Sequence, residues 1–187
     1  MKNFNELEQK AADWIKSHEC KLLIALLLSY AFLMFVIQGE IRLHIDNPGY
    51  TDPAVNYVTG HGFTSTCWYA QGGDAFWAGN VPLHPFLLIP WFKIFGVSLS
   101  SVLWLNFLYV MAGVVLIWQA TQKSDFISAA HWRLGAVAFF LLTDCAHYLL
   151  TFGRYDALGF LLIALSANLL TVQNQAWRFG GLFIGAS

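Results

Sequence analysis

Several acidic residues that lie far apart in the sequence could take part in catalysis or binding, judged from the residues around them. The first is Asp46, which follows a long apolar run and precedes Pro48 and Gly49. Because Pro48 and Gly49 disfavour a helix, we expect a loop to hold the Asp46 carboxylate. A carboxylate that is partly desolvated beside apolar groups can take the proton from a hydroxyl group. The alternative is that Asp46 only caps a turn of this loop.

A second set of polar residues interrupts a later apolar stretch. Asp144, His147, Thr151 and Arg154 follow one another at spacings that put them on one face of a helix. An acidic residue inside an apolar span is costly unless it is paired or faces water. Asp144 and His147 are therefore either a relay for protons or substrate, or a polar pair that only fixes packing.

Arg154 and Asp156 stand between two apolar stretches, in a short segment that contains Gly153. An arginine can bind a phosphate through two parallel hydrogen bonds. Asp156 could orient a substrate or a reacting group. The alternatives are that the Arg154 side chain extends to the membrane surface and that Asp156 caps the helix that follows.

Other polar residues of the loop have structural explanations. Asp52 precedes Pro53 and is followed by Gly60, which predicts a short helix at 53–59 with Asp52 as its N-cap. Asp74 follows two glycines and is typical of a turn.

Three histidines, His44, His61 and His84, lie in the same loop as these carboxylates. They could join the carboxylates in a site for a divalent metal, but their spacing matches no established ligand pattern. We therefore expect polar contacts at the membrane surface rather than a metal centre, and no cofactor is certain.

The composition identifies lipid as the main solvent of the chain. Of the 187 residues, 57% are hydrophobic and 11% are charged, and the mean hydropathy is +0.54. A soluble domain usually has about 25% charged residues. The net charge is −1 and no basic cluster is present, so nucleic acid is not an expected partner.

The apolar runs predict an all-α polytopic membrane protein with about four complete transmembrane helices and a truncated fifth. Residues 1–21 form an amphipathic surface segment, 22–41 the first span, 42–98 a large outer loop and 99–187 the remaining spans. Within these regions we expect an interfacial helix at 82–95, later spans at 102–118, 134–152 and 157–172, and a fifth segment at 179–187. Because this last segment is too short to cross a bilayer, we expect the chain to be a fragment of a longer protein.

The distribution of lysine and arginine predicts the orientation of the chain. More lysines and arginines lie in segments on the same side of the membrane as the amino terminus, so we expect the amino terminus to be cytoplasmic. The outer loop and the segment around Arg154 then share the opposite face, where residues distant in sequence can meet.

Several motifs occur in an order that resembles the amino-terminal part of GT-C fold glycosyltransferases that use polyprenyl-phosphate sugars. The relatives we name are the aminoarabinose transferase, protein O-mannosyltransferase and rhizobial lipopolysaccharide glycosyltransferase groups. The motifs are Asp46, Tyr50 and Ala54 with the glycine-rich residues 60–63, then residues 81–85, and last residues 153–158. Members of this family have many more spans than this chain.

The resemblance implies an activity and a set of site residues. Asp46 is the base that deprotonates the acceptor, and Asp156 corresponds to a second acidic residue. Arg154 lies near the donor phosphate, and Tyr50 and His84 join it in substrate binding. The reaction implied is transfer with inversion from a lipid-linked sugar to an unknown envelope acceptor, in a bacterial inner membrane whose lipids are further partners.

Two other classes of function remain open at this stage. The chain could be a fragment of a transporter or ion relay that uses Asp144 and His147, or a non-catalytic membrane protein whose loop binds a partner. Deletion of residues 64–74 should disable a transferase but spare a relay centred on Asp144.

Overall fold

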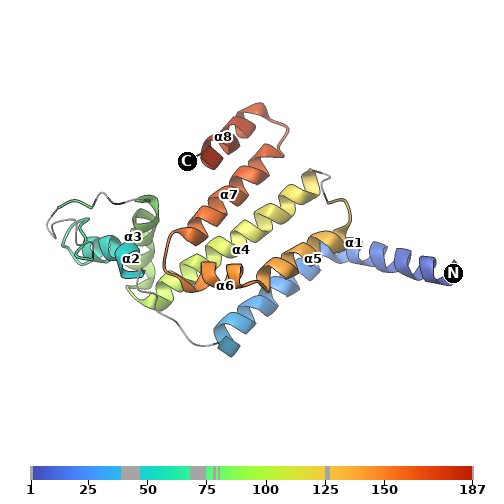
Figure 1. Ribbon diagram of the computed structural model, residues 1–187, viewed down its shortest axis with the longest axis horizontal. Helices are drawn as coiled ribbons and strands as arrows, with labels where there is room; N and C mark the ends of the chain where they lie inside the picture. The colour runs from blue at the N-terminus through green and yellow to red at the C-terminus, as the bar shows by residue number, and fades with distance from the viewer. Residues whose placement is uncertain are drawn as a thin grey trace. The chain divides into compact units, whose positions relative to one another are not determined.

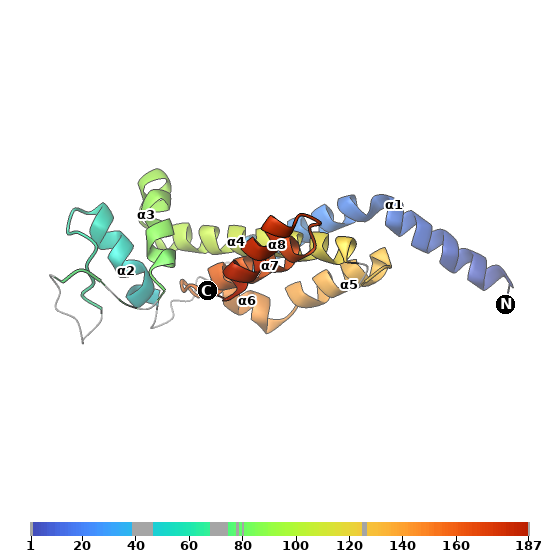
Figure 2. The same cartoon turned by 90° about the horizontal axis from the view of Figure 1, so that it is seen from above.

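The computed structural model describes residues 2–38, 47–67, 75–77, 79, 81–124 and 127–186. This part of the chain is helical, and its only β-type pairing is an isolated antiparallel bridge between Thr64 and Phe76. The helices, shown in Figures 1 and 2, are α1 (Lys2–Phe32), the π-helical η1 (Leu33–Gln38), α2 (Asn47–Val58), α3 (Leu83–Phe95), α4 (Leu99–Lys123), α5 (Ala130–Leu141), α6 (Asp144–Thr151), α7 (Asp156–Leu170) and α8 (Gln175–Ala186).

The chain divides into two compact units. Unit 1 comprises Met1–Glu40, Met111–Ala146 and Leu162–Ser187, and unit 2 comprises Ile41–Val110 and His147–Leu161.

Two helices in the described part of the chain are long and apolar enough to cross a membrane. They are Glu6–Val36 and α4, and α5 with α6 makes a third if this bent pair is one span. Helix α7 has 15 residues and is about 22 Å long, less than the ~30 Å thickness of a bilayer core. The membrane character expected from the composition is thus confirmed with two or three spans, and the predicted count of four and a fifth is not confirmed.

The amino-terminal boundary between a surface segment and the first span is not a break in the helix. Helix α1 runs without interruption through residue 21, where the sequence analysis separated the two. The physical reason is that neither glycine nor proline occurs between residues 2 and 38. A change from polar to apolar residues therefore changes the surroundings of this helix without ending it.

The predicted third span at 134–152 is bent by 56° between α5 and α6. At the break the Thr143 hydroxyl donates to the carbonyl oxygen of Phe140 at 2.6 Å. Such a side-chain bond competes with the helical hydrogen bonds of the backbone. Helix α6 then ends at Thr151, so Arg154 lies beyond it and the expected polar stripe does not continue to Arg154 on one helix.

Helix α2 begins earlier than predicted. It starts at Asn47 and contains Pro48, so the prediction that Pro48 and Gly49 prevent a helix was wrong. Proline is tolerated in the first helical turn, where its missing N–H would have no partner in any case. The prediction of Asp52 as an N-cap was also wrong, because Asp52 lies inside this helix.

Unit 2 has its core between α2, α3 and the first turns of α4. Figures 1 and 2 show α2 beside α3. The core residues are Ala54, Leu88, Phe92, Val102 and Leu105. Helix α3 confirms the helix predicted for 82–95, and it ends at Gly96, whose φ of +81° suits glycine.

Unit 1 contains a buried ion pair between α1 and α5. The guanidinium of Arg133 donates from Nε to Oε1 of Glu19 at 2.7 Å and from Nη2 to Oε2 at 2.6 Å. The Trp118 indole N–H on α4 donates to the same carboxylate at 2.8 Å, and Gln122 donates at 3.3 Å. Because Glu19 and Arg133 are both buried, this network connects three helices of unit 1 through charges that have hydrogen-bond partners.

Helices α7 and α8 approach each other closely within unit 1. The Ser166 hydroxyl of α7 donates to the carbonyl oxygen of Gly181 on α8 at 2.5 Å. A Cβ atom added at Gly181 would lie 3.0 Å from the Leu169 Cβ, and one at Gly185 would lie 2.6 Å from the Ser166 hydroxyl. Small residues four apart therefore allow this contact, as they do in many membrane helix pairs.

Candidate functional site

The turn 153–156 between α6 and α7 holds an arginine beside an aspartate. Arg154 Nε lies 3.1 Å from Asp156 Oδ2, and the two side chains are 20% and 28% exposed. Asp156 begins α7, where the helix dipole favours a negative charge. The two residues that the sequence analysis selected in this segment therefore form an ion pair between partly exposed side chains.

Tyrosines surround the guanidinium of Arg154. Its Cζ atom lies 5.6 Å from the ring centroids of both Tyr50 and Tyr155. The two rings meet edge to face with their centroids 5.0 Å apart. Arg154 Nη1 also donates to the Tyr148 hydroxyl at 3.4 Å. Ring faces attract a cation, so the tyrosines fix the position of the guanidinium as well as shield it from water.

The surroundings of Arg154 keep it charged. Burial alone would lower the pKa of Arg154, but the hydrogen bond with Tyr155 and the charge of Asp156 outweigh burial and raise it. A guanidinium has five N–H donors, so an ion pair with Asp156 is compatible with a second, anionic ligand. The local chemistry is that of a fixed cation at a partly exposed turn.

A fully buried asparagine fixes the backbone next to this turn. Asn106 lies on α4 with no exposed surface, and its Nδ2 donates to the carbonyl oxygen of Phe152 at 2.5 Å. Polar side chains inside an apolar helix usually have such a partner. Asn106 thereby links α4 to the residue that precedes Gly153.

His84 lies against the turn but is closed to solvent. It is in the first turn of α3 and has no exposed surface. Burial lowers the pKa of His84 to about 4, and contact with the backbone of Gly153 opposes this shift. Within the described residues neither ring nitrogen has a partner at hydrogen-bond geometry. His84, for which substrate binding stays a prediction, is therefore neutral at pH 7 and lies against the backbone of the turn.

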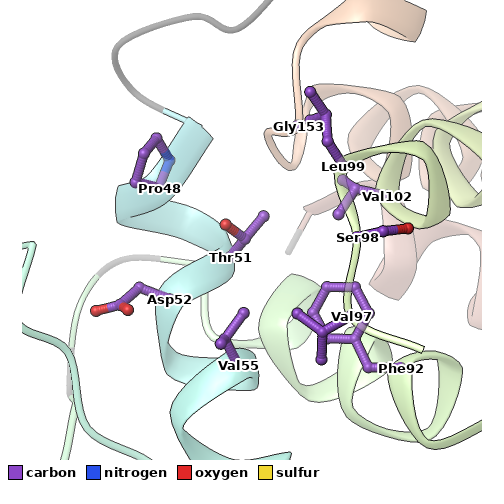
Figure 3. Close-up of a pocket in the computed structure, with 10 residues that line it drawn as sticks. All are labelled: Pro48, Thr51, Asp52, Val55, Phe92, Val97, Ser98, Leu99, Val102 and Gly153. Carbon is purple, nitrogen blue, oxygen red and sulfur yellow. The ribbon is translucent and has the colours of Figure 1, made fainter.

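An apolar cavity of about 290 Å³ lies between α2 and the start of α4 (Figure 3). Its lining comes from α2, the end of α3, the α3–α4 connection, the start of α4 and the turn that carries Arg154. The residues are Pro48, Thr51, Asp52, Val55, Phe92, Val97, Ser98, Leu99, Val102 and Gly153. Because Gly153 precedes Arg154 directly, the cavity and the cation belong to adjoining parts of one unit.

The carboxylate of Asp52 points away from this cavity in Figure 3. It accepts hydrogen bonds from the Ser65 hydroxyl at 2.9 Å and from the Thr66 N–H at 2.8 Å. Asp52 thus fastens the loop at residues 65–66 to helix α2, which is a structural role.

The remaining predicted residues are not part of this arrangement. Asp46, His44 and Asp74 lie outside the described residues. Asp144 is exposed in the first turn of α6, where the helix dipole favours a carboxylate. His147 is half-buried on the same helix, and its carbonyl oxygen accepts the Thr151 hydroxyl at 2.9 Å.

Metal-ligating side chains do not gather in the described part of the chain. No group of three or more histidine, cysteine, aspartate or glutamate residues there could hold a metal ion.

Sequence reasoning missed three residues of the site. Tyr155 stands between two selected residues, and its ring could have been suspected from that position. Asn106 had a signal of its own, because an amide inside an apolar span requires a partner. No signal in the sequence pointed to Tyr148, because its contact with Arg154 depends on how the turn folds back on α6.

Comparison with known proteins adds no assignment. Neither a protein-family model nor a curated protein nor a solved structure matches the chain.

Proposed function

We propose that the chain is the amino-terminal part of an inverting GT-C fold glycosyltransferase. It would move a sugar from a polyprenyl-phosphate donor to an envelope acceptor. The observation that supports this proposal best is the convergence of Tyr50, Arg154 and Asp156, because two separate motifs of the family resemblance supplied these residues.

The chemistry of the donor agrees with the site. A polyprenyl-phosphate sugar has an anionic phosphate next to a long apolar chain. The charged Arg154 suits the phosphate, and the cavity that ends at Gly153 suits apolar groups.

In the proposed reaction the acceptor hydroxyl attacks the anomeric carbon from the side opposite the phosphate. The new carbon–oxygen bond forms as the bond to the phosphate oxygen breaks, so the configuration inverts. Asp46 takes the hydroxyl proton as general base. The polyprenyl phosphate leaves with the bonding electron pair, and Arg154 stabilises its charge. Asp156 holds Arg154 in place.

Membership of the proposed family would also imply a more detailed membrane topology. The chain would have about four complete spans and part of a fifth. Its amino terminus would lie in the cytoplasm of a bacterium. The outer loop and the turn 153–156 would face the opposite side of the inner membrane.

The test is transfer of a radiolabelled sugar from polyprenyl-phosphate donors by membranes that contain the full-length transferase of which the chain is proposed to be the amino-terminal part. We expect Asp46→Asn and Arg154→Gln to reduce transfer at least a hundredfold while protein levels stay equal. Asp13→Asn on the exposed surface of α1 is the matched control and should transfer normally.

Asp144→Asn separates the transferase from a relay in the membrane. It should leave transfer unchanged, because Asp144 takes no part in the proposed reaction. Absence of transfer by the full-length protein with every donor, or normal transfer by its Asp46→Asn variant, would refute the proposal.

A further inference from the structure

Two exposed cations of unit 1 contact the carboxyl end of α7. The ammonium group of Lys123, in the last turn of α4, donates to Oδ1 of Asn168 at 3.3 Å. Nε of Arg178, on α8, donates to the carbonyl oxygen of Val172 at 2.8 Å. Because Asn168 and Val172 are four residues apart, the two cations are held one helical turn, or ~5 Å, from each other along the chain.

The protein fixes these cations without neutralising them. Asn168 is 6% exposed and also donates to the carbonyl oxygen of Leu116 at 3.0 Å, so it holds Lys123 from a fixed position. Within the described part of the chain, neither cation forms an ion pair and the Nη groups of Arg178 make no hydrogen bond. A guanidinium that is bound only through Nε keeps two parallel N–H groups for an anion.

The cations lie at the end of a membrane span. Helix α4 is long and apolar enough to cross a membrane, and Lys123 is its last residue. Trp177, directly before Arg178, is 58% exposed, and Trp132 near the start of α5 is 68% exposed. Exposed tryptophans and basic residues at the end of a span are typical of the level of the lipid head groups. We therefore expect head groups around Lys123 and Arg178.

An exposed apolar stripe on α8 follows Arg178. Phe179, Leu182 and Phe183 are 70%, 56% and 79% exposed, and their spacing puts them on one face of the helix. Figures 1 and 2 show α8 turning back beside α7, and the two helices are in contact at Gly181. The stripe therefore runs from the level of the head groups toward the hydrocarbon. A cation followed by such a stripe suits a ligand with an anionic head and apolar chains.

We propose that Lys123 and Arg178 bind the head group of an anionic phospholipid such as phosphatidylglycerol. The outer N–H groups of Arg178 bind the phosphate through two parallel hydrogen bonds, and Lys123 adds a second positive charge. The acyl chains pack on the stripe 179–183. Phosphatidylcholine has the same phosphate, but its choline group would bring a third cation to the site. The site therefore selects lipids by net charge.

This inference does not depend on the proposed transferase. Its residues belong to the segments 111–146 and 162–187 of unit 1, whereas Tyr50, Arg154 and Asp156 belong to unit 2. Free glycerol 3-phosphate carries the same kind of anion without acyl chains, so it serves to distinguish a lipid ligand from a soluble one.

The experiment measures binding to the full chain in neutral detergent micelles by native mass spectrometry. The probes are phosphatidylglycerol, phosphatidylcholine with the same acyl chains, and glycerol 3-phosphate. We expect the first phosphatidylglycerol to bind at least tenfold more tightly than phosphatidylcholine, and glycerol 3-phosphate to bind at least tenfold more weakly than phosphatidylglycerol. Equal affinity for the two lipids would overturn the proposal, and so would glycerol 3-phosphate that binds as tightly as phosphatidylglycerol.

Variants test whether the two cations form the site. Arg178→Gln should reduce the preference for phosphatidylglycerol about tenfold and Lys123→Gln about threefold, whereas Arg178→Lys should have an intermediate effect because it keeps only the charge. Lys10→Gln is the matched control and should keep the preference, because Lys10 is exposed on α1 about 13 Å before Glu19 along the helix. Circular dichroism checks that each variant keeps its helix content. An unchanged preference in Arg178→Gln, or an equal loss in Lys10→Gln, would contradict a site at these residues.

Discussion

The ring of Tyr50 lies 5.6 Å from the guanidinium carbon of Arg154, although one residue belongs to α2 and the other to the turn before α7. The two residues meet because α2, α3 and the start of α4 pack into one unit with the segment 147–161. This contact brings a residue of the large loop to a cation from a much later part of the chain. It is the structural basis of the proposed site.

The Arg154–Asp156 pair should matter little for stability. Both side chains are partly exposed, and such pairs usually contribute about 0–1 kcal/mol. We expect Arg154→Gln to lower the free energy of unfolding by no more than about 1 kcal/mol, as measured by denaturant titration in detergent micelles. A loss above about 2 kcal/mol would mean that this arginine holds the fold together, and a defect in transfer would then not identify a site.

The buried pair of unit 1 should behave in the opposite way. Glu19→Ala leaves the guanidinium of Arg133 buried without its anion, and we expect a loss of about 3–5 kcal/mol in the same titration. Glu8→Ala, on the exposed part of α1, is the control and should change stability by less than about 0.5 kcal/mol. Removal of both charges in Glu19→Leu with Arg133→Leu should recover part of the loss. A double variant that is less stable than Glu19→Ala would contradict this account.

Asn106 should control the order of the turn that carries Arg154. Asn106→Leu keeps the volume of the side chain but leaves the Phe152 carbonyl oxygen without its donor. We expect a loss of about 1–3 kcal/mol and faster amide hydrogen exchange at residues 152–156. Leu108→Ala, at an exposed position of the same helix, is the comparison. Unchanged exchange at the turn in Asn106→Leu would show that this hydrogen bond does not hold it.

The buried histidine predicts a pH dependence of stability. Burial lowers the pKa of His84 to about 4 in the folded chain, whereas the unfolded value is 6.5. As the pH falls below 6.5 the unfolded state gains a proton that the folded state excludes, so the free energy of unfolding decreases until about pH 4. The change across this window is about 3 kcal/mol.

Replacement of this histidine isolates its contribution. His84→Gln should lose this part of the pH dependence, whereas His61→Gln, at an exposed histidine, should keep it. The measurement is a denaturant titration at several pH values between 4 and 7. Equal pH slopes for the wild type and His84→Gln would contradict a neutral buried imidazole.

Local sequence signals predicted some helices well and others poorly. Gly96 marks the end of α3 correctly, and the short polar segment at 153–156 separates two helices as expected. Pro48 misled the prediction because proline disfavours the interior of a helix but is tolerated in its first turn. No proline or glycine lies at the bend between α5 and α6, so no local residue predicted this bend.

Contacts between distant residues were the part that sequence could not supply. The chemistry of Arg154 and Asp156 was visible from residue type and position, and their neighbour Tyr50 came from the family resemblance. The pairing of Glu19 with Arg133 depends on how α1 packs against α5, and neither residue has a neighbour in sequence that reveals the other. Tertiary packing decides which buried polar groups meet.

The most direct test of the proposed site compares the binding of polyprenyl phosphate and of polyprenol, which lacks the phosphate, to the chain in nanodiscs. The nanodiscs contain excess phosphatidylglycerol, which occupies the site proposed at Lys123 and Arg178. We expect the wild type to bind polyprenyl phosphate at least tenfold more tightly. Arg154→Gln should lose this preference, and Lys10→Gln, at an exposed lysine of α1, should keep it. Equal binding of the two lipids by the wild type, or an unchanged preference in Arg154→Gln, would contradict a phosphate site at this turn.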